Sequence, residues 1–293
     1  MNGRCGLCNK EKELQASHII PCFVFKWLKE SSVTGYFRHG ETINKRVQDG
    51  DKLYLLCWDC EQLFGGWEDI FAKEVFMPLH QNKPINQYGA WLLKFSTSVS
   101  WRVLTYFKNH LDLKHFPENL LMSVDNALRT WQEFLFDERP HPDGCEQHLL
   151  PFLGLIGNYS GTGMPSNFNR YVSRSVDIDV ACSATEAFVY AKMCRILLIG
   201  FIEMDHRERW RDTKVHLKHG ILEKNHYKVP ATVSNFMFYK AHRLQEVEKR
   251  ISDRQWKRID KDYRKYSDEF HGSEMFKAIT QDSILFGEAA FDD

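Results

Sequence analysis

Apolar side chains recur at helical spacing in several separate stretches of the chain. The shortest pattern covers residues 23–30, and a second covers residues 61–77, just before a proline. Two longer patterns cover roughly residues 88–111 and 117–137, and the latter opens on a proline, which suits a helix start. The tail at about residues 231–266 has the same spacing. These patterns predict a chain rich in helices.

Extended segments are predicted between the helices. Residues 13–20 and 53–56 have the character of short strands, and residues 171–182 alternate apolar with polar side chains, as in a strand with one wet face. Residues 188–202 are apolar and β-branched, which indicates a buried strand, or a strand that follows a short helix. Residues 214–217 add one further short strand. The fold is therefore expected to be mixed.

The composition is that of a globular chain, with 43% hydrophobic and 14% aromatic residues among 293. Lys plus Arg and Asp plus Glu both number 39, so the overall charge gives no argument for nucleic acid, and a polyanion site would have to be a local patch. No run of about 18 apolar residues occurs, and the N-terminus lacks an apolar signal segment. We therefore expect a cytoplasmic protein with no membrane partner.

The eight cysteines include two CxxC pairs, Cys5 with Cys8 and Cys57 with Cys60. Zinc prefers four thiolate or imidazole ligands in a tetrahedron, and a CxxC turn presents two sulfurs to one ion. In a reducing compartment such pairs indicate a metal rather than disulfides. The sequence therefore predicts a structural Zn²⁺ site, with a chance occurrence of reduced thiols as the alternative. Gly6 is expected to ease the tight turn of the first pair.

Further motifs lie between and beside the cysteine pairs. Residues 16–21 read Ala-Ser-His-Ile-Ile-Pro, and residues 55–60 read Leu-Leu-Cys-Trp-Asp-Cys ahead of a predicted helix. This order resembles the HNH (ββα-metal) endonucleases that carry an extra zinc knuckle, over about residues 5–75. The resemblance implies that the cysteines hold structural zinc and that His18 is the general base that activates water to attack a phosphodiester. It also implies a catalytic divalent metal.

The chain departs from that family at the metal-binding positions. Ser17 stands where the family usually has a His or Asp, and Glu61 stands where a His is common. A carboxylate can bind Mg²⁺ or Mn²⁺, so Glu61 is expected to be a catalytic metal ligand that acts with His18. Two further family positions, a late His and a central Asn, are occupied by other residues.

Two functions therefore stay open at the level of the sequence. The first is an HNH-like metal-dependent nuclease, in which His18 activates water and Glu61 helps to hold Mg²⁺ or Mn²⁺, with DNA or RNA as the substrate. By analogy, HNH-like modules fused to larger bodies are frequent in bacterial phage-defence systems. The second is a catalytically inactive zinc-finger subunit that binds a protein or nucleic-acid partner.

The predicted fold class is α+β. A small zinc-bound treble-clef/HNH-like module at residues 1–80 is followed by a helical segment at residues 81–140, with a turn and boundary at residues 140–144. Residues 141–293 are expected to form the remaining body, in which helices, including those of the C-terminus, accompany a small antiparallel sheet.

Two stretches concentrate cations. Residues 31–51, predicted to form an extended loop or irregular hairpin, interleave Arg38 and Arg46 with aromatics, a combination that suits phosphates and bases. Residues 250–265 hold seven Lys or Arg and three Asp. Because acids dilute both stretches, a solvated surface is the favoured interpretation of each.

Overall fold

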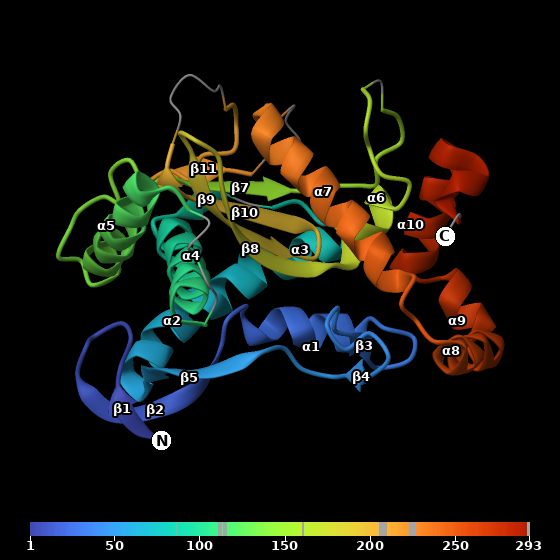
Figure 1. The fold of residues 1–293 in the computed structure, drawn as a ribbon, viewed down its shortest axis with the longest axis horizontal. Helices are drawn as coiled ribbons and strands as arrows, with labels where there is room; N and C mark the ends of the chain where they lie inside the picture. Colours follow the sequence, from blue (N-terminus) through green and yellow to red (C-terminus); the bar gives the residue numbers. More distant parts are fainter. Residues whose placement is uncertain are drawn as a thin grey trace. The chain divides into compact units, whose positions relative to one another are not determined.

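The computed structural model contains two compact units, each assembled from segments that are distant in the sequence. It describes residues 1–85, 87–110, 113, 116–159, 161–204, 210–222 and 227–291. Unit 1 comprises Met1–Pro21, Gly50–Leu153 and Val176–Lys228. Unit 2 comprises Cys22–Asp49, Gly154–Ser175 and Val229–Asp293. The described chain mixes helices with antiparallel sheets, as Figure 1 shows.

Unit 1 begins with a three-stranded antiparallel sheet in the order β1-β2-β5. The strands are β1 (Asn2–Arg4), β2 (Glu11–His18) and β5 (Lys52–Cys57). The register places Leu14 opposite Cys57 and His18 opposite Lys52. The two strands predicted in this region are therefore confirmed, although β2 ends at His18 rather than at residue 20.

A nearly continuous helical stretch follows Cys57. It comprises α2 (Trp58–Phe71), a π-helical turn (Ala72–Phe76) and α3 (Met77–His80). The helix starts at Trp58 rather than at the predicted residue 61, with Cys57 as its N-cap residue. It also continues past Pro78. This proline lies in the first turn of α3, where a backbone N–H makes no hydrogen bond within the helix, so the missing N–H costs nothing there.

A second sheet of unit 1 is antiparallel throughout, in the order β7-β10-β9-β8 (Figure 1). Its strands are β7 (Gln147–Pro151), β8 (Val176–Cys182), β9 (Ala187–Met193) and β10 (Ile196–Glu203). Both long predicted helices are confirmed as α4 (Trp91–His110) and α5 (Glu118–Leu135). Helix α4 contacts all four strands. It begins later than residue 88 because β6 (Gln87–Gly89) pairs with β11 (His219–Ile221).

Helix α4 approaches this sheet closely because the residues between them are small. Ser100 is fully buried, and its hydroxyl donates to Gln147 Oε1 at 2.7 Å. Gly200 of β10 lies opposite, where an added Cβ would stand 2.2 Å from Ser100 Oγ. Any side chain at position 200 would therefore push the helix away from the sheet.

Three predicted strands differ from the structure. Within residues 171–182, the first part belongs to α6 (Phe168–Arg174), and the strand is confined to Val176–Cys182. Residues 188–202 form two strands rather than one, joined by a tight turn in which Cys194 has φ of 54°. Both strands are buried along almost their whole length, and even Lys192 and Arg195, the charged residues that flank the turn in the sequence, are buried. Residues 214–217 contribute an isolated bridge, with Lys214 opposite His148.

A buried polar cluster lies beside β7. His148 is 1% exposed, and its Nδ1 lies 2.8 Å from the Thr213 hydroxyl. Its Nε2 lies 3.5 Å from Glu146 Oε2, and Lys214 Nζ donates to Glu146 Oε1 at 2.5 Å. The His148 hydrogen bond and the Lys214 ammonium lower the pKa of Glu146 to about 2, against the effect of burial. Burial lowers the pKa of His148.

Acid is expected to destabilise unit 1 through this cluster. The folded-state pKa of Glu146 lies below the unfolded value of 4.5, so its contribution is present above pH 4.5 and is lost as the pH falls towards 2. The complete loss amounts to roughly 3 kcal/mol, since each pKa unit corresponds to about 1.4 kcal/mol. Urea unfolding at pH 6 and pH 3 measures the greater part of it, with Glu146→Gln as the control. Equal pH dependence in the two proteins would contradict the assignment.

Unit 2 is mainly helical. Its elements are α1 (Cys22–Glu30), β3 (Phe37–Arg38), β4 (Arg46–Val47), α6, α7 (Ala231–Glu248), α8 (Asp253–Lys265), α9 (Ser267–His271), α10 (Glu274–Phe286) and a 3-10 turn (Gly287–Ala290). Helix α6 contacts α7 and α10. The buried Asp282 of α10 accepts the N–H groups of Asn169 and Arg170 at 2.8 and 3.1 Å. A carboxylate from another helix therefore satisfies the free N–H groups of α6.

The segment after α1 forms the predicted irregular hairpin, with β3 paired to β4. Its two central arginines contact α8. Arg46 Nη2 lies 2.6 Å from Asp262 Oδ2, and Arg38 Nη2 donates to Gln255 Oε1 at 3.3 Å. Burial lowers the pKa of Arg38. The interpretation as a solvated loop therefore misses these two contacts, although Arg46 remains exposed.

The two units do not follow the predicted linear domains. Residues 1–80 are not one compact module, because residues 22–49 belong to unit 2. The turn at residues 140–144 does not separate units either, since Gly50–Leu153 is continuous within unit 1. Pairing of β7 with β10 and the contact of α4 with the second sheet hold this segment together with β8–β10.

Candidate metal centre

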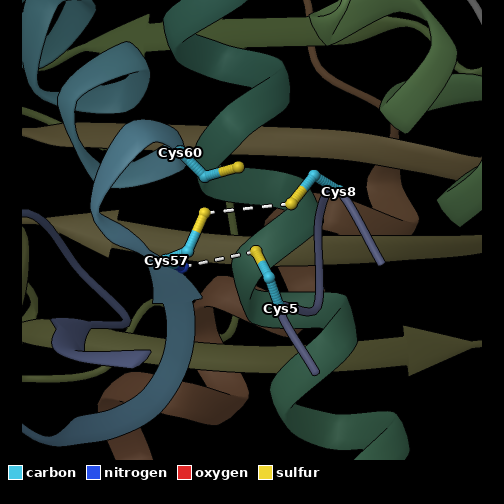
Figure 2. A group of neighbouring side chains, drawn as sticks. All are labelled: Cys5, Cys8, Cys57 and Cys60. Carbon is cyan, nitrogen blue, oxygen red and sulfur yellow. Dashed lines mark hydrogen bonds between the residues drawn. The ribbon is translucent and has the colours of Figure 1, made fainter. Parts of the chain in front are cut away.

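Two segments of unit 1 bring the four predicted zinc ligands together. Cys5 and Cys8 lie in the turn between β1 and β2, Cys57 ends β5, and Cys60 lies in the first turn of α2. Pairing of β2 with β5 carries the second pair to the first, because Leu14 lies opposite Cys57. Figure 2 shows the four side chains converging, with their sulfurs turned towards one another.

The sulfur geometry suits one tetrahedral zinc ion. All four sulfurs lie within 4.8 Å of one another, and the Sγ atoms of Cys8 and Cys57 are 3.8 Å apart. That separation excludes a disulfide, whose S–S bond is about 2.05 Å. A tetrahedron with Zn–S distances of about 2.3 Å has sulfurs about 3.8 Å apart. This four-cysteine cluster could therefore hold a metal ion such as zinc.

The protein environment alone favours the thiolate of Cys5, whereas burial raises the pKa of Cys8 and Cys60. Cys5, Cys57 and Cys60 are buried, and the Cys57 N–H donates to Cys5 Sγ at 3.3 Å. Burial tends to raise the pKa of Cys5, but backbone N–H groups directed at its sulfur bring that pKa down to about 7. Burial raises the pKa of Cys60, which without a metal stays protonated. A bound cation reverses that effect by stabilising the thiolate.

The backbone around the first pair forms a closed knuckle. The N–H of Cys5 donates to the Lys10 carbonyl and the N–H of Asn9 to the Cys5 carbonyl, both at 2.9 Å. Asn9 has φ of 58°, a left-handed conformation that asparagine tolerates well. The Gly6 N–H donates to the Leu55 carbonyl at 2.9 Å, which fastens the knuckle to β5.

Gly6 is required by packing rather than by backbone conformation. An added Cβ would lie 2.8 Å from Leu55 Cδ1 and 3.4 Å from both the Leu55 carbonyl and the Trp101 ring. Its φ is not in the left-handed region. The explanation expected from the sequence, relief of a tight turn, is therefore replaced by close contact with β5 and α4.

Gly6→Ala is expected to lower the free energy of unfolding of unit 1 by about 1–3 kcal/mol, because the methyl group overpacks the contact with Leu55. Gly66→Ala is the matched control. Nothing lies within 4 Å of a Cβ at Gly66, inside α2, so that change is expected to stabilise by about 0.5–1 kcal/mol. Urea denaturation measures both, and equal shifts would refute the packing argument.

The knuckle and α2 pack against the long helices of the same unit. Gln132 of α5 donates its amide to the Leu7 carbonyl at 2.6 Å. The rings of Phe71 and Phe95 stack with centroids 3.8 Å apart, which joins α2 to α4. The metal centre is therefore part of a larger core and not an independent finger.

His18, the predicted general base, is the last residue of β2 and is half-buried. Its backbone is held from α4, because Arg102 Nη1 donates to the His18 carbonyl at 3.1 Å. The same guanidinium lies 2.6 Å from Glu68 Oε1 of α2, and Arg102 is 2% exposed. One buried ion pair thus fixes the end of β2 relative to both helices.

The two other side chains expected beside His18 have different surroundings. Ser17 is fully buried, and its hydroxyl donates to the Gln15 carbonyl at 3.5 Å. Neighbouring residues of a strand point to opposite faces, so Ser17 and His18 diverge. Glu61 is half-buried in the first turn of α2. Among the described residues, Glu61 belongs to no group of three or more His, Cys, Asp or Glu ligand atoms within 4.8 Å of one another.

Exposed residues that sequence reasoning missed share the sheet face of His18. Lys52 lies opposite His18, and Tyr54 lies opposite Ala16 on the same face of the paired strands. Tyr54 is 57% exposed, and Trp58, at the start of α2, is 60% exposed. Only the first three residues of β5 follow an exposed, half-buried, exposed order, and the last three are all buried, so the available signal was short.

Comparison with protein-family models, with curated proteins and with solved structures finds no match to this chain. None of the helices in the described ranges combines the length and the apolar character that crossing a membrane requires.

Proposed function

We propose that this chain is an HNH-like nuclease that hydrolyses phosphodiesters in DNA or RNA, with His18 as general base. The observation that carries the proposal is the arrangement of unit 1 around its four-cysteine cluster. A cysteine knuckle, a β2–β5 pair and helix α2 meet at the four sulfurs, and β2 ends on His18. This order of elements is what a zinc-bound treble-clef/HNH-like module requires.

The proposed chemistry places one proton transfer on His18. A neutral imidazole nitrogen accepts a proton from water as the water oxygen attacks phosphorus. The bond from phosphorus to the leaving oxygen then breaks, and that oxygen takes a proton from solvent. Arg102 acts as a positioning residue, because it holds the His18 carbonyl and not the reacting atoms.

The residues present fit a structural zinc ion but not a catalytic metal ion. The four-cysteine cluster fits zinc, which would be structural because all four positions of its tetrahedron are filled by protein. The catalytic Mg²⁺ or Mn²⁺ expected from the resemblance does not fit the expected ligands. Ser17 is buried with its hydroxyl on a carbonyl, and Glu61 joins no ligand group among the described residues. The proposal therefore places the chemistry on His18 alone.

The second candidate function is a catalytically inactive zinc-finger subunit that binds a protein or nucleic-acid partner. The burial of Ser17 favours it, since a metal ligand is missing where the HNH family has one. The exposed Lys52 and Tyr54 on one face of β5, together with the exposed Trp58 at the start of α2, would suit binding to phosphates and stacked bases. A cytoplasmic location and a role in bacterial phage defence accompany the nuclease candidate by analogy only.

Cleavage assays distinguish the two candidates. The zinc-loaded protein is incubated with labelled single- and double-stranded DNA and RNA, without added metal and with Mg²⁺ or Mn²⁺. Cutting that depends on His18 supports the nuclease. Binding without cutting by the zinc-loaded protein supports the inactive subunit. Glu61→Gln tests the remaining metal expectation, and an unchanged metal dependence in that variant would remove Glu61 from the site.

A further inference from the structure

Helix α8 of unit 2 carries a continuous row of exposed cations. Its members recur at helical spacing, three, four, seven and eleven residues after the first, so they share one face. They are Arg254, Lys257, Arg258, Lys261 and Lys265. At 1.5 Å per residue the row is about 16 Å long.

Three Asp residues lie beside or between these cations in the sequence, and two of them form ion pairs with residues outside the row. Asp260 pairs with Arg264 at 3.0 Å. Asp262 accepts the Tyr36 hydroxyl at 2.5 Å and lies 2.6 Å from Arg46. Only Asp253, in the first turn of α8, is left near the row without such a contact among the described residues. The face is therefore more positive than the sequence alone indicates.

In the described part of the chain, four of the five cations are unpaired, and the fifth, Lys265, lies 4.6 Å from the centroid of the Tyr266 ring. Arg254, Lys257, Arg258 and Lys261 make no ion pair or hydrogen bond with any residue in the described ranges. Other exposed lysines do find partners, such as Lys108 with Asp125 at 2.5 Å. In a chain whose net charge is zero, an unpaired row of this kind is a local positive field and not part of a global one.

The side of α8 about 100° from the cation row is fixed within unit 2. Gln255 is 7% exposed and accepts from Arg38, and the Ser252 N–H donates to Asn44 Oδ1 at 2.8 Å just before the helix. These contacts determine which face of α8 is turned outward. A prealigned row of cations loses little freedom when it binds a regular row of anions.

We propose that the cation face of α8, defined by these five residues, docks the phosphate backbone of double-stranded DNA. A duplex carries one negative charge per about 1.7 Å of its axis, so a row about 16 Å long can reach several phosphates. The exposed aromatics Trp256 and Tyr263 lie about half a helical turn from Arg254, so the face offers no platform for stacking single-stranded bases.

Duplex DNA fits the face better than duplex RNA. The major groove of B-form DNA is about 12 Å wide and admits a helix, whereas the A-form groove of RNA is deep and narrow. This inference deepens the proposed function and rests on it for its biological role, because a nuclease module needs a means of holding its substrate. Binding itself needs no cleavage and is tested separately.

The test measures binding to a fluorescein-labelled DNA duplex of about 24 base pairs by fluorescence anisotropy at several salt concentrations. The slope of the logarithm of the binding constant against the logarithm of the salt concentration is expected to become shallower by about 3 when three phosphate contacts are removed. In this binding assay every protein carries His18→Ala, which on the proposed function slows cutting by about 10²–10⁴-fold. The test variant combines Lys257→Gln, Arg258→Gln and Lys261→Gln. Its affinity at low salt is expected to fall about tenfold or more.

The matched control removes the same charge elsewhere. It combines Lys73→Gln, Lys108→Gln and Arg129→Gln, three exposed positions outside α8, and is expected to bind as the parent does. Circular dichroism confirms that both triple variants are folded, which is expected because all substituted side chains are exposed.

Several outcomes would overturn the inference. These are equal affinity of the two triple variants, no DNA binding by the parent at low salt, tighter α8-dependent binding of an RNA duplex, and α8-dependent binding to anionic phosphatidylserine vesicles in place of DNA. If binding depends on α8 but the protein with His18 intact never cuts, the nuclease is refuted and this inference stands. If the protein with His18 intact cuts and duplex binding does not depend on α8, this inference is refuted and the nuclease stands.

Discussion

Cys57→Ser is expected to release the bound zinc and to lower the melting temperature of unit 1 by about 10 °C or more. Cys57 joins β5 to α2, and its thiolate would supply one of four ligands. Zinc binding contributes about 10–16 kcal/mol in small zinc-dependent folds, which is comparable with the whole stability of a domain. For a domain of 150–250 residues, each kcal/mol lost shifts the melting temperature by about 2–4 °C.

Metal analysis and thermal unfolding measure this effect together. The parent is expected to contain one zinc per chain, and chelation of that zinc should reproduce the behaviour of the variant. Cys182→Ser is the matched control, because Cys182 is half-buried on β8 and lies outside the cluster. A metal-free parent with the same melting temperature as the zinc-loaded protein would contradict the structural role of the cluster.

His18→Ala is expected to reduce cleavage by about 10²–10⁴-fold while leaving zinc content and melting temperature close to those of the parent, since a general base contributes about that much. The reason for the separation is that the Arg102 guanidinium holds the backbone carbonyl of His18, which the substitution retains. Truncating the imidazole therefore leaves the end of β2 in place.

Single-turnover cleavage rates measure the loss. His219→Ala, at an exposed position of β11, is the control and should cut at the rate of the parent. Parent-like cutting by His18→Ala would show that His18 is not the base. If the zinc-loaded parent cuts no substrate, the inactive binding subunit becomes the better function.

Local patterns predicted much of the secondary structure. Helices α4 and α5, strand β5 and the hairpin of β3 and β4 follow from apolar spacing and from turn-forming residues. The main errors arose where burial is uniform, as along β9 and β10, because a mostly apolar run shows no period, and the charged Lys192 and Arg195 were the one sign of the turn. The strand prediction at residues 171–174 was wrong for a different reason. A clear alternating pattern is present there, but it belongs to the short helix α6, which packs on α10.

The sequence by itself identified the four candidate metal ligands, because two CxxC pairs supply them whatever the path between the pairs, and the structure brings those sulfurs within 4.8 Å. It also placed His18 in a motif. Only the tertiary structure decided what surrounds each residue. The hold of Arg102 on the His18 carbonyl joins segments 84 residues apart in sequence, and the contact of Arg46 with Asp262 spans 216. Such contacts depend on how helices and sheets pack, and no local pattern of side chains encodes them.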